Sequence, residues 1–168
     1  GITAFNFPVM LASWMFPISI ACGNTFVLKP SEQDPSATMM LVDLAHKAGI
    51  PAGVLNVIHG GPDVASRLCE HKKTKAVSFI GSTNVGTKIY DMAGKNGKRA
   101  QCMMGAKNHC VIMDDAHKGR AINDIVGSAY GAAGQRCMAN PVTILVGEAR
   151  SWMPEIIEKS KTMVIDSG

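Results

Sequence analysis

The sequence is poor in charged and in aromatic residues. Of its 168 residues, 18% are charged and 5% are aromatic, whereas 46% are hydrophobic and the net charge is +4. Because the lysines and arginines are scattered, we expect neither a nucleic-acid partner nor binding to a membrane surface. A composition this apolar also excludes a disordered or collagen-like chain and suffices for a domain with a buried core.

Long hydrophobic runs and a targeting segment are also missing. The longest apolar run, residues 8–21, is interrupted by Ser13, Pro17 and Ser19. It is shorter than the roughly 20 residues that cross a bilayer. The chain opens at Gly1 without an initiator methionine and without a signal or transit segment. Since both ends resemble ordered protein, we expect a piece of a larger protein.

The cysteines and histidines lack the spacing of a metal or redox site. The number of cysteines is five, which is odd, no two form a Cys-x-x-Cys pair, and the five histidines form no His-x-x-x-His pair. We therefore expect that the chain binds no metal ion and that its thiols are reduced. Each cysteine is by default a small buried apolar residue. The five are Cys22, Cys69, Cys102, Cys110 and Cys137.

What the sequence does contain is a regular alternation of strand-like and helix-like segments. It predicts an α/β fold, an open Rossmann-like parallel sheet with helices on both faces. Gly23, Gly49 and Gly94 are expected as C-terminal helix caps, and Pro17 as a kink or a second start in the first helix. The predicted strands are 25–28, 54–59, 76–80, 99–102, 109–113 and 141–146, and the predicted helices are 8–21, 35–48, 62–70, 84–93, 118–132 and 151–163.

A glycine-containing turn, residues 81–86, follows a predicted strand and opens a predicted helix. Free N–H groups and the helix dipole would make this turn an anion site. The alternative is an ordinary strand-to-helix turn. A third possibility is a P-loop module, which the sequence nearly matches, although Gly86 is followed by Thr87-Lys88 instead of Lys and Ser or Thr.

Two further turns lie where ligands bind in parallel sheets. Lys29 and Glu32 follow the strand at 25–28, and such a pair could bind ribose hydroxyls. The alternative is a surface turn with a helix cap. Asn6 precedes Phe7-Pro8, where a strand turns into a helix, so it could cap that helix or direct an amide N–H at an oxyanion.

One cysteine has surroundings that suggest chemistry. Cys137 follows Gly134-Gln135-Arg136 and a run of small residues that permit close approach to the backbone. An accessible cysteine there could be a nucleophile, with Arg136 favouring its thiolate. The alternative is a buried loop cysteine.

Taken together and in this order, these segments resemble the aldehyde dehydrogenase superfamily over essentially the whole chain. Within it, the segments at 104–109 and 131–139 are most similar to the CoA-acylating branch that oxidises methylmalonate and malonate semialdehydes. The segments that carry the resemblance are Phe5-Asn6-Phe7-Pro8, Gly23-Asn24-Thr25, Lys29-Pro30-Ser31-Glu32, Pro51-Ala52-Gly53-Val54-Leu55-Asn56, Phe79-Ile80-Gly81-Ser82-Thr83, Met104-Gly105-Ala106-Lys107-Asn108 and Gly134-Gln135-Arg136-Cys137.

The resemblance implies catalytic roles for three residues. Cys137 would attack the aldehyde carbonyl, and the Asn6 amide with the Cys137 backbone N–H would form the oxyanion hole. Arg136 would bind the substrate carboxylate, or would only tune Cys137. The product of hydride transfer would be a thioester on Cys137, which then needs water or another thiol.

The resemblance also implies the cofactor residues. Lys29 and Glu32 would hold the adenosine ribose of NAD, Ser82 would lie at the pyrophosphate, and Thr3 and Phe5 would lie along the nicotinamide half. Gln33 is assigned to the cofactor too, although acylating relatives tend to carry arginine there.

Met103 stands where hydrolytic members carry the glutamate that activates water. Methionine cannot act as a base, so water attack on the thioester should be slow and CoA remains as the acceptor. The acylating relatives carry asparagine at this position, so Met103 departs from both patterns.

The resemblance finally implies a domain division and a cellular setting. Residues 1–106 would be part of an NAD-binding domain, and residues 107–168 the first, incomplete part of a catalytic domain. Full-length relatives would be homotetramers in the mitochondrial matrix, acting in valine and pyrimidine breakdown. The alternative to an active enzyme is an inactive truncated chain that at most binds nucleotide.

Overall fold

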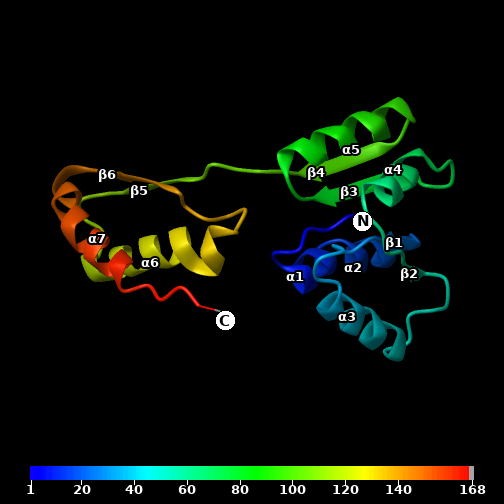
Figure 1. The fold of residues 1–168 in the computed structure, drawn as a ribbon, viewed down its shortest axis with the longest axis horizontal. Coiled ribbons are helices and arrows are strands. Elements are labelled where there is room, and N and C mark those ends of the chain that lie inside the picture. The colour runs from blue at the N-terminus through cyan, green and yellow to red at the C-terminus, as the bar shows by residue number, and fades with distance from the viewer. Residues whose placement is uncertain (167–168) are drawn as a thin grey trace. The chain divides into compact units, whose positions relative to one another are not determined.

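The computed structural model describes residues 1–166 and divides into two compact units, Gly1–Gly105 and Ala106–Gly168 (Figure 1). The boundary lies one residue before the division at 106/107 that the sequence predicts. Each unit is described by itself below.

The first unit alternates strands and helices, because turn residues separate its apolar segments. Pro8 and Pro62 open their helices, where a missing N–H costs nothing. In order, its elements are α1 (Pro8–Ser13), α2 (Phe16–Ala21), β1 (Phe26–Leu28), α3 (Ser36–Lys47), β2 (Leu55–Val57), α4 (Pro62–Glu70), β3 (Ala76–Ile80), α5 (Thr83–Lys95) and β4 (Arg99–Met103).

The chain's first residues lie in the middle of the parallel strands. β1 pairs with β2 and β3 with β4, and Ile2 forms parallel bridges to both Lys29 and Phe79. The Ile2 N–H donates to the Ser78 carbonyl at 2.8 Å and the Thr3 N–H to the Lys29 carbonyl at 3.1 Å. The resulting order is β2, β1, residues 1–3, β3, β4. The direction of winding reverses between residues 1–3 and β3, which makes that position a topological switch point.

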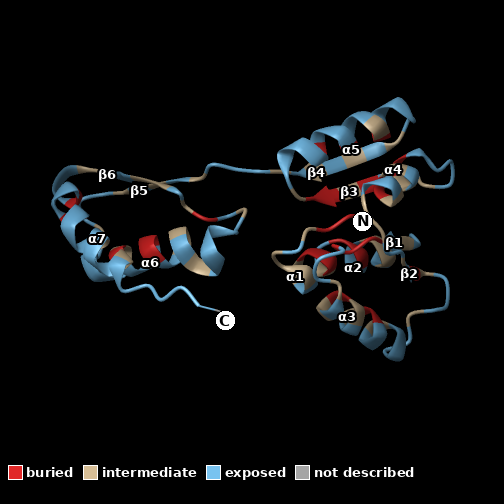
Figure 2. Ribbon diagram, in the orientation of Figure 1, coloured by how far each residue is buried: buried red, intermediate tan, exposed pale blue. Residues whose placement is uncertain are grey.

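Apolar side chains cover both faces of this sheet. On one face Val77 and Phe79 pack with Cys69 of α4 and Ile89 of α5, and on the other Leu28 and Leu55 pack against α1, α2 and α3. Figure 2 shows the buried residues concentrated on β3 and on the inner sides of the helices. The expected Rossmann-like α/β architecture is confirmed.

The second helix start expected at Pro17 is confirmed: residues 8–21 divide into α1 and α2, and α2 begins at Phe16 with Pro17 in its first turn. Two other local expectations need correction. Gly94 does not cap α5 because the helix continues to Lys95, and Gly97, with φ 66°, makes the left-handed turn instead. The helix predicted to reach 132 ends at Tyr130.

The second unit is a helix pair against two parallel strands. Its core is formed by Ile122, Ala149 and Trp152, and an ion pair joins Lys118 of α6 to Glu155 of α7. Its elements are β5 (His109–Ile112), α6 (Lys118–Tyr130), the short 3₁₀ turn η1 (Gly131–Gly134), β6 (Val142–Leu145), η2 (Gly147–Trp152) and α7 (Met153–Lys161). Over the part of the chain that the structure describes, no helix is long and apolar enough to span a membrane.

Candidate active site

The carboxyl end of the central segment contains a buried hydroxyl without a partner. Thr3 is 5% exposed, and its Oγ1 is the one buried side-chain oxygen or nitrogen within residues 1–166 that lacks a hydrogen bond. Since an unpaired buried hydroxyl is costly, such a group is a recognised sign of a ligand. Thr3 lies beside the switch point, where ligands bind in sheets of this type.

Lys29 lies next to Thr3 on the neighbouring strand, and Glu32 pairs with Lys29. The Lys29 side chain is 5% exposed, and its Nζ donates to the Pro30 carbonyl at 2.8 Å and to Glu32 Oε2 at 3.1 Å. The backbone N–H of Glu32 and then the Lys29 ammonium hold the pKa of that carboxyl below its usual range. The alternative of a helix cap is wrong, because Pro35 is the N-cap of α3. The end of β1 thus carries a buried lysine paired with a carboxylate, and the neighbouring segment carries the unpaired hydroxyl of Thr3.

The N-terminus of α5 begins directly after β3. Only Gly81 and Ser82 connect the two elements, and the Ser82 side chain makes no capping bond. The first-turn N–H groups of the helix have no intrahelical acceptors, and no acidic residue lies in that turn. A Cβ on Gly81 would lie 2.5 Å from the Phe79 ring, so glycine permits this tight turn.

The P-loop reading of residues 81–88 is wrong. A P-loop holds its second glycine outside the helix, whereas Gly86 is buried inside α5. A Cβ on Gly86 would lie 2.5 Å from Cγ of Met104, so this glycine serves packing.

The other predicted residues of the first unit lie around the same edge. Phe5 is exposed and Asn6 is half-buried in the turn before α1. Because Phe7 is the N-cap of α1, the capping alternative for Asn6 is wrong. Gln33 is exposed, and its backbone N–H donates to the Ser31 hydroxyl at 3.2 Å.

Cys137 lies half-buried on a loop, and the backbone that leads into this loop has unusual torsion angles. After α6, Ala132 and Ala133 adopt left-handed torsions, with φ 53° and 52°. This conformation costs roughly 1–2 kcal/mol for each L residue. Gly134 follows with φ 73°, where glycine carries no such penalty. The backbone strain thus lies directly before the predicted nucleophile, as it often does at functional sites.

Arg136 lies against the last turn of α6. A Cβ built on Gly131 would be 2.7 Å from the Arg136 guanidinium carbon, so only glycine leaves room for this side chain. The helix C-terminus carries partial negative charge, which favours a cation there. Arg136 remains exposed to solvent.

Asn108 is a residue whose role the sequence reasoning missed. Its Nδ2 donates to the Cys137 carbonyl at 2.8 Å and to the Ala139 carbonyl at 2.9 Å. Asn108 belongs to a segment that carries the family resemblance, but its partners are 29 and 31 residues away. No local pattern could have shown this contact.

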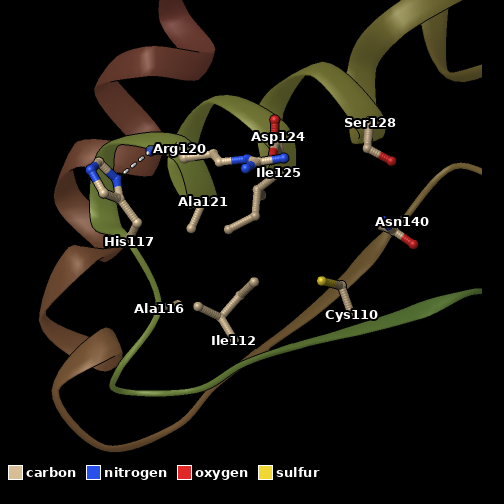
Figure 3. Close-up of a pocket in the computed structure, with 10 residues that line it drawn as sticks. All are labelled: Cys110, Ile112, Ala116, His117, Arg120, Ala121, Asp124, Ile125, Ser128 and Asn140. Atoms are coloured by element: carbon tan, nitrogen blue, oxygen red, sulfur yellow. Dashed lines mark hydrogen bonds and ion pairs between the residues drawn. The ribbon is translucent and has the colours of Figure 1, made fainter.

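A cavity of about 330 Å³ opens between α6 and the β5–β6 pair. Figure 3 shows the Cys110 thiol and Ile112 on the strand side, facing Ala121 and Ile125 on the helix. None of the predicted site residues lines this cavity. It lies in the second unit, and Asn140, the residue after Ala139, is where its lining comes nearest in sequence to Cys137.

Of the remaining thiols, Cys69 and Cys102 pack in the core of the first unit, whereas Cys22 is exposed, so the expectation of a buried residue is wrong for Cys22. Burial raises the pKa of the Cys69 and Cys102 thiols, and all five cysteines are free of disulfides. Within the described residues, no cluster of three histidine, cysteine or acidic side chains could hold a metal ion. Met103 ends β4 with 42% of its surface exposed.

A family model and the curated relatives of this chain both identify the same family. Residues 1–167 match the model of the aldehyde dehydrogenase family. The chain is 51% identical over its whole length to the acylating, mitochondrial methylmalonate-semialdehyde/malonate-semialdehyde dehydrogenase of Mus musculus, and spans 31% of that protein. The corresponding protein of Bos taurus is 50% identical, again with 31% of its length covered. The chain therefore spans about a third of these curated relatives.

Solved structures of aldehyde dehydrogenases also match this chain. A protein from Sinorhizobium meliloti, described as a methylmalonate-semialdehyde dehydrogenase complexed with NAD, matches 96% of this chain with a TM-score of 0.88 at 49% identity; the match covers 32% of that protein. An NAD-dependent aldehyde dehydrogenase of the same species matches 98% with a TM-score of 0.93 at 34% identity, covering 33% of its chain.

Proposed function

Because the chain belongs to the aldehyde dehydrogenase family, we propose that it carries the cofactor-binding and nucleophile-bearing parts of an NAD-dependent, CoA-acylating dehydrogenase of methylmalonate and malonate semialdehydes. The observation that carries this proposal is the loop of Cys137. A half-buried thiol follows strained backbone and an arginine, and Asn108 donates two hydrogen bonds to the loop's backbone, at the Cys137 and Ala139 carbonyls. The names of relatives about half identical to this chain support the substrate class.

The first unit fits NAD. Lys29 and Glu32 would bind the adenosine ribose hydroxyls, Ser82 with the first turn of α5 would bind the pyrophosphate, and Thr3 would use its unpaired hydroxyl on the cofactor. Phe5 and Gln33 would line the same edge. When bound, NAD supplies the acceptor for the aldehyde's hydride. The chain itself would bind the ribose of the cofactor with the carboxylate of Glu32, and its phosphates with the free N–H groups in the first turn of α5.

Lys29→Met is expected to weaken NAD binding by roughly 10–100-fold, because a hydrogen bond to a charged group contributes about 1.5–3 kcal/mol and its loss frees Glu32. Isothermal titration with NAD measures this. Lys47→Met is the matched control, since its bridge to Asp43 lies on the exposed face of α3. Equal dissociation constants for both variants would contradict the ribose assignment.

In the second unit, Cys137 provides the nucleophile. As a thiolate, its sulfur would form a bond to the aldehyde carbon while the carbonyl π bond opens to an oxyanion, to which the Cys137 N–H would donate. The Asn6 amide is proposed as the second donor from its family motif alone. After the hydride has left, the acyl group is held as a thioester on Cys137, and the thiol of CoA displaces it. Arg136 would bind the substrate carboxylate while lying against Gly131.

Met103 explains why CoA is the acceptor. Methionine has no basic atom that could take a proton from water. Met103→Glu is expected to raise NADH formation in the absence of CoA by about 100-fold, the scale of general-base catalysis. The measurement is the ratio of initial rates without and with CoA. Met103→Gln has the same size without the base, and a comparable rise in that variant would refute the explanation.

The function is tested with NAD, CoA and methylmalonate semialdehyde, following NADH absorbance and acyl-CoA by mass spectrometry. The proposal expects both products to accumulate together over many turnovers when CoA is present, and NADH to stop at about one equivalent per chain when CoA is absent. Because the chain spans about a third of its relatives, the second candidate is a chain that binds NAD without turnover. NAD binding without NADH formation would favour this candidate.

The cellular setting belongs to the same proposal. Names of relatives that include "mitochondrial" support the mitochondrial matrix, and the whole protein would assemble as a homotetramer. Its partners would be small semialdehydes, with NAD and CoA.

A further inference from the structure

The loop that carries Cys137 is held from a strand by one side chain. Both N–H bonds of the Asn108 carboxamide are available, and Nδ2 donates to the carbonyls of Cys137 and Ala139 at 2.8 and 2.9 Å. Asn108 immediately precedes β5, which pairs with β6 along its whole length. The donor therefore stands at the end of a hydrogen-bonded strand, the most rigid kind of support in this unit.

The two acceptors lie on a closed turn. The Ala139 N–H donates to the Arg136 carbonyl at 3.2 Å, so residues 136–139 fold back on themselves. Ala139 is buried, at 6% exposure. Holding the carbonyl of Cys137 restrains the peptide plane that follows it, and so limits how far the backbone can rotate about ψ of Cys137.

The backbone before this turn, at Ala132 and Ala133, is strained and needs its surroundings to hold it. Ala132 and Ala133 hold left-handed torsions that L residues rarely adopt. Backbone of this kind persists only where its surroundings hold it. Without Asn108, the loop would be free to relax away from the arrangement that half-buries Cys137.

We propose that Asn108 is the positioning residue of the nucleophile: its carboxamide holds the Cys137 and Ala139 carbonyls so that the thiol and N–H of Cys137 face the substrate together. The inference about Asn108 rests on the proposed function, because that function makes Cys137 the nucleophile. The hydrogen bonds of Asn108 are independent of the proposed function. Asn108 acts through Cys137 and need not touch the substrate.

The test compares Asn108→Leu, which keeps the size but removes both donors, with Asn108→Gln, which keeps a carboxamide. Each variant is treated with iodoacetamide, and alkylation of Cys137 and of Cys110 is followed by peptide mass spectrometry. Cys110 lies on β5 in the same unit and reports unfolding of that unit. Asn56→Leu is the matched control, because Asn56 donates to the Gly53 carbonyl at 2.8 Å in the first unit.

In Asn108→Leu, Cys137 is expected to be alkylated roughly tenfold faster, the scale expected for losing two hydrogen bonds, with Cys110 unchanged. Asn108→Gln should lie between the wild type and this variant, and Asn56→Leu should match the wild type. An unchanged rate at Cys137 overturns the proposal. An equal rise at Cys110 also overturns it, since Asn108 would then hold the whole unit.

A kinetic arm separates this inference from the proposed function. In a chain that turns over, Asn108→Leu should lower kcat and leave the KM for NAD unchanged, and a changed KM with an unchanged kcat would contradict positioning. If the wild type forms no NADH, the proposed function fails, and the alkylation rates still decide whether Asn108 positions Cys137.

Discussion

Cys137→Ala is expected to abolish NADH formation, with a loss of roughly 10⁶-fold in kcat, the scale seen when a covalent nucleophile is removed. The physical reason is that no other group in the proposed site can form and release an acyl bond. NADH absorbance with the semialdehyde and CoA measures the loss, and NAD binding should be retained because the cofactor residues lie in the other unit.

Cys22→Ala is the control for this experiment. Cys22 is an exposed thiol at the end of α2, so its loss should leave the rate unchanged. Residual turnover in Cys137→Ala at the wild-type rate would show that another residue carries the acyl group.

Asn6→Ala is expected to lower kcat by about 100–1,000-fold, the usual effect of removing one oxyanion donor. The effect should fall on kcat and leave the KM for NAD unchanged, because the donor acts on charge that develops during the reaction. Asn6→Asp should be at least as slow, since it removes the donor and adds a negative charge.

Asn96→Ala gives a matched comparison for Asn6. Asn96 donates from its side chain to the Met92 carbonyl at 2.9 Å, at the end of α5. Its loss should lower the melting temperature without lowering kcat. If Asn6→Ala behaves in the same way, the oxyanion role is refuted and Asn6 is a structural residue of its turn.

The parts of the fold that could be predicted are those with local signals. The strand at 76–80 and the helix at 62–70 have the predicted bounds, because lysines and a glycine flank the first and proline opens the second. The break between α1 and α2 was foreseen from Pro17, but its position at Trp14 and Met15 was not. Gly94 misled the prediction, since nothing in the sequence distinguishes a glycine inside a helix from one after it.

The sequence indicated which residues to consider for the candidate site, but it did not indicate their contacts or backbone torsions. The sequence singles out Lys29 and Glu32 as a pair that could bind ribose, but their ion pair depends on how the loop after β1 folds. The unpaired hydroxyl of Thr3 depends on what surrounds it in the sheet, and alanine has no preference for the torsions of Ala132 and Ala133. These features arise from tertiary packing, which overrides local propensity.

The measurement that tests the account most directly is the mass of the chain after incubation with NAD and the semialdehyde in the absence of CoA. If Cys137 is the nucleophile, one acyl adduct forms, which peptide mapping locates at Cys137 and which CoA removes, with acyl-CoA as the product. An adduct on any other cysteine, or NADH formed with no adduct on Cys137, would contradict it.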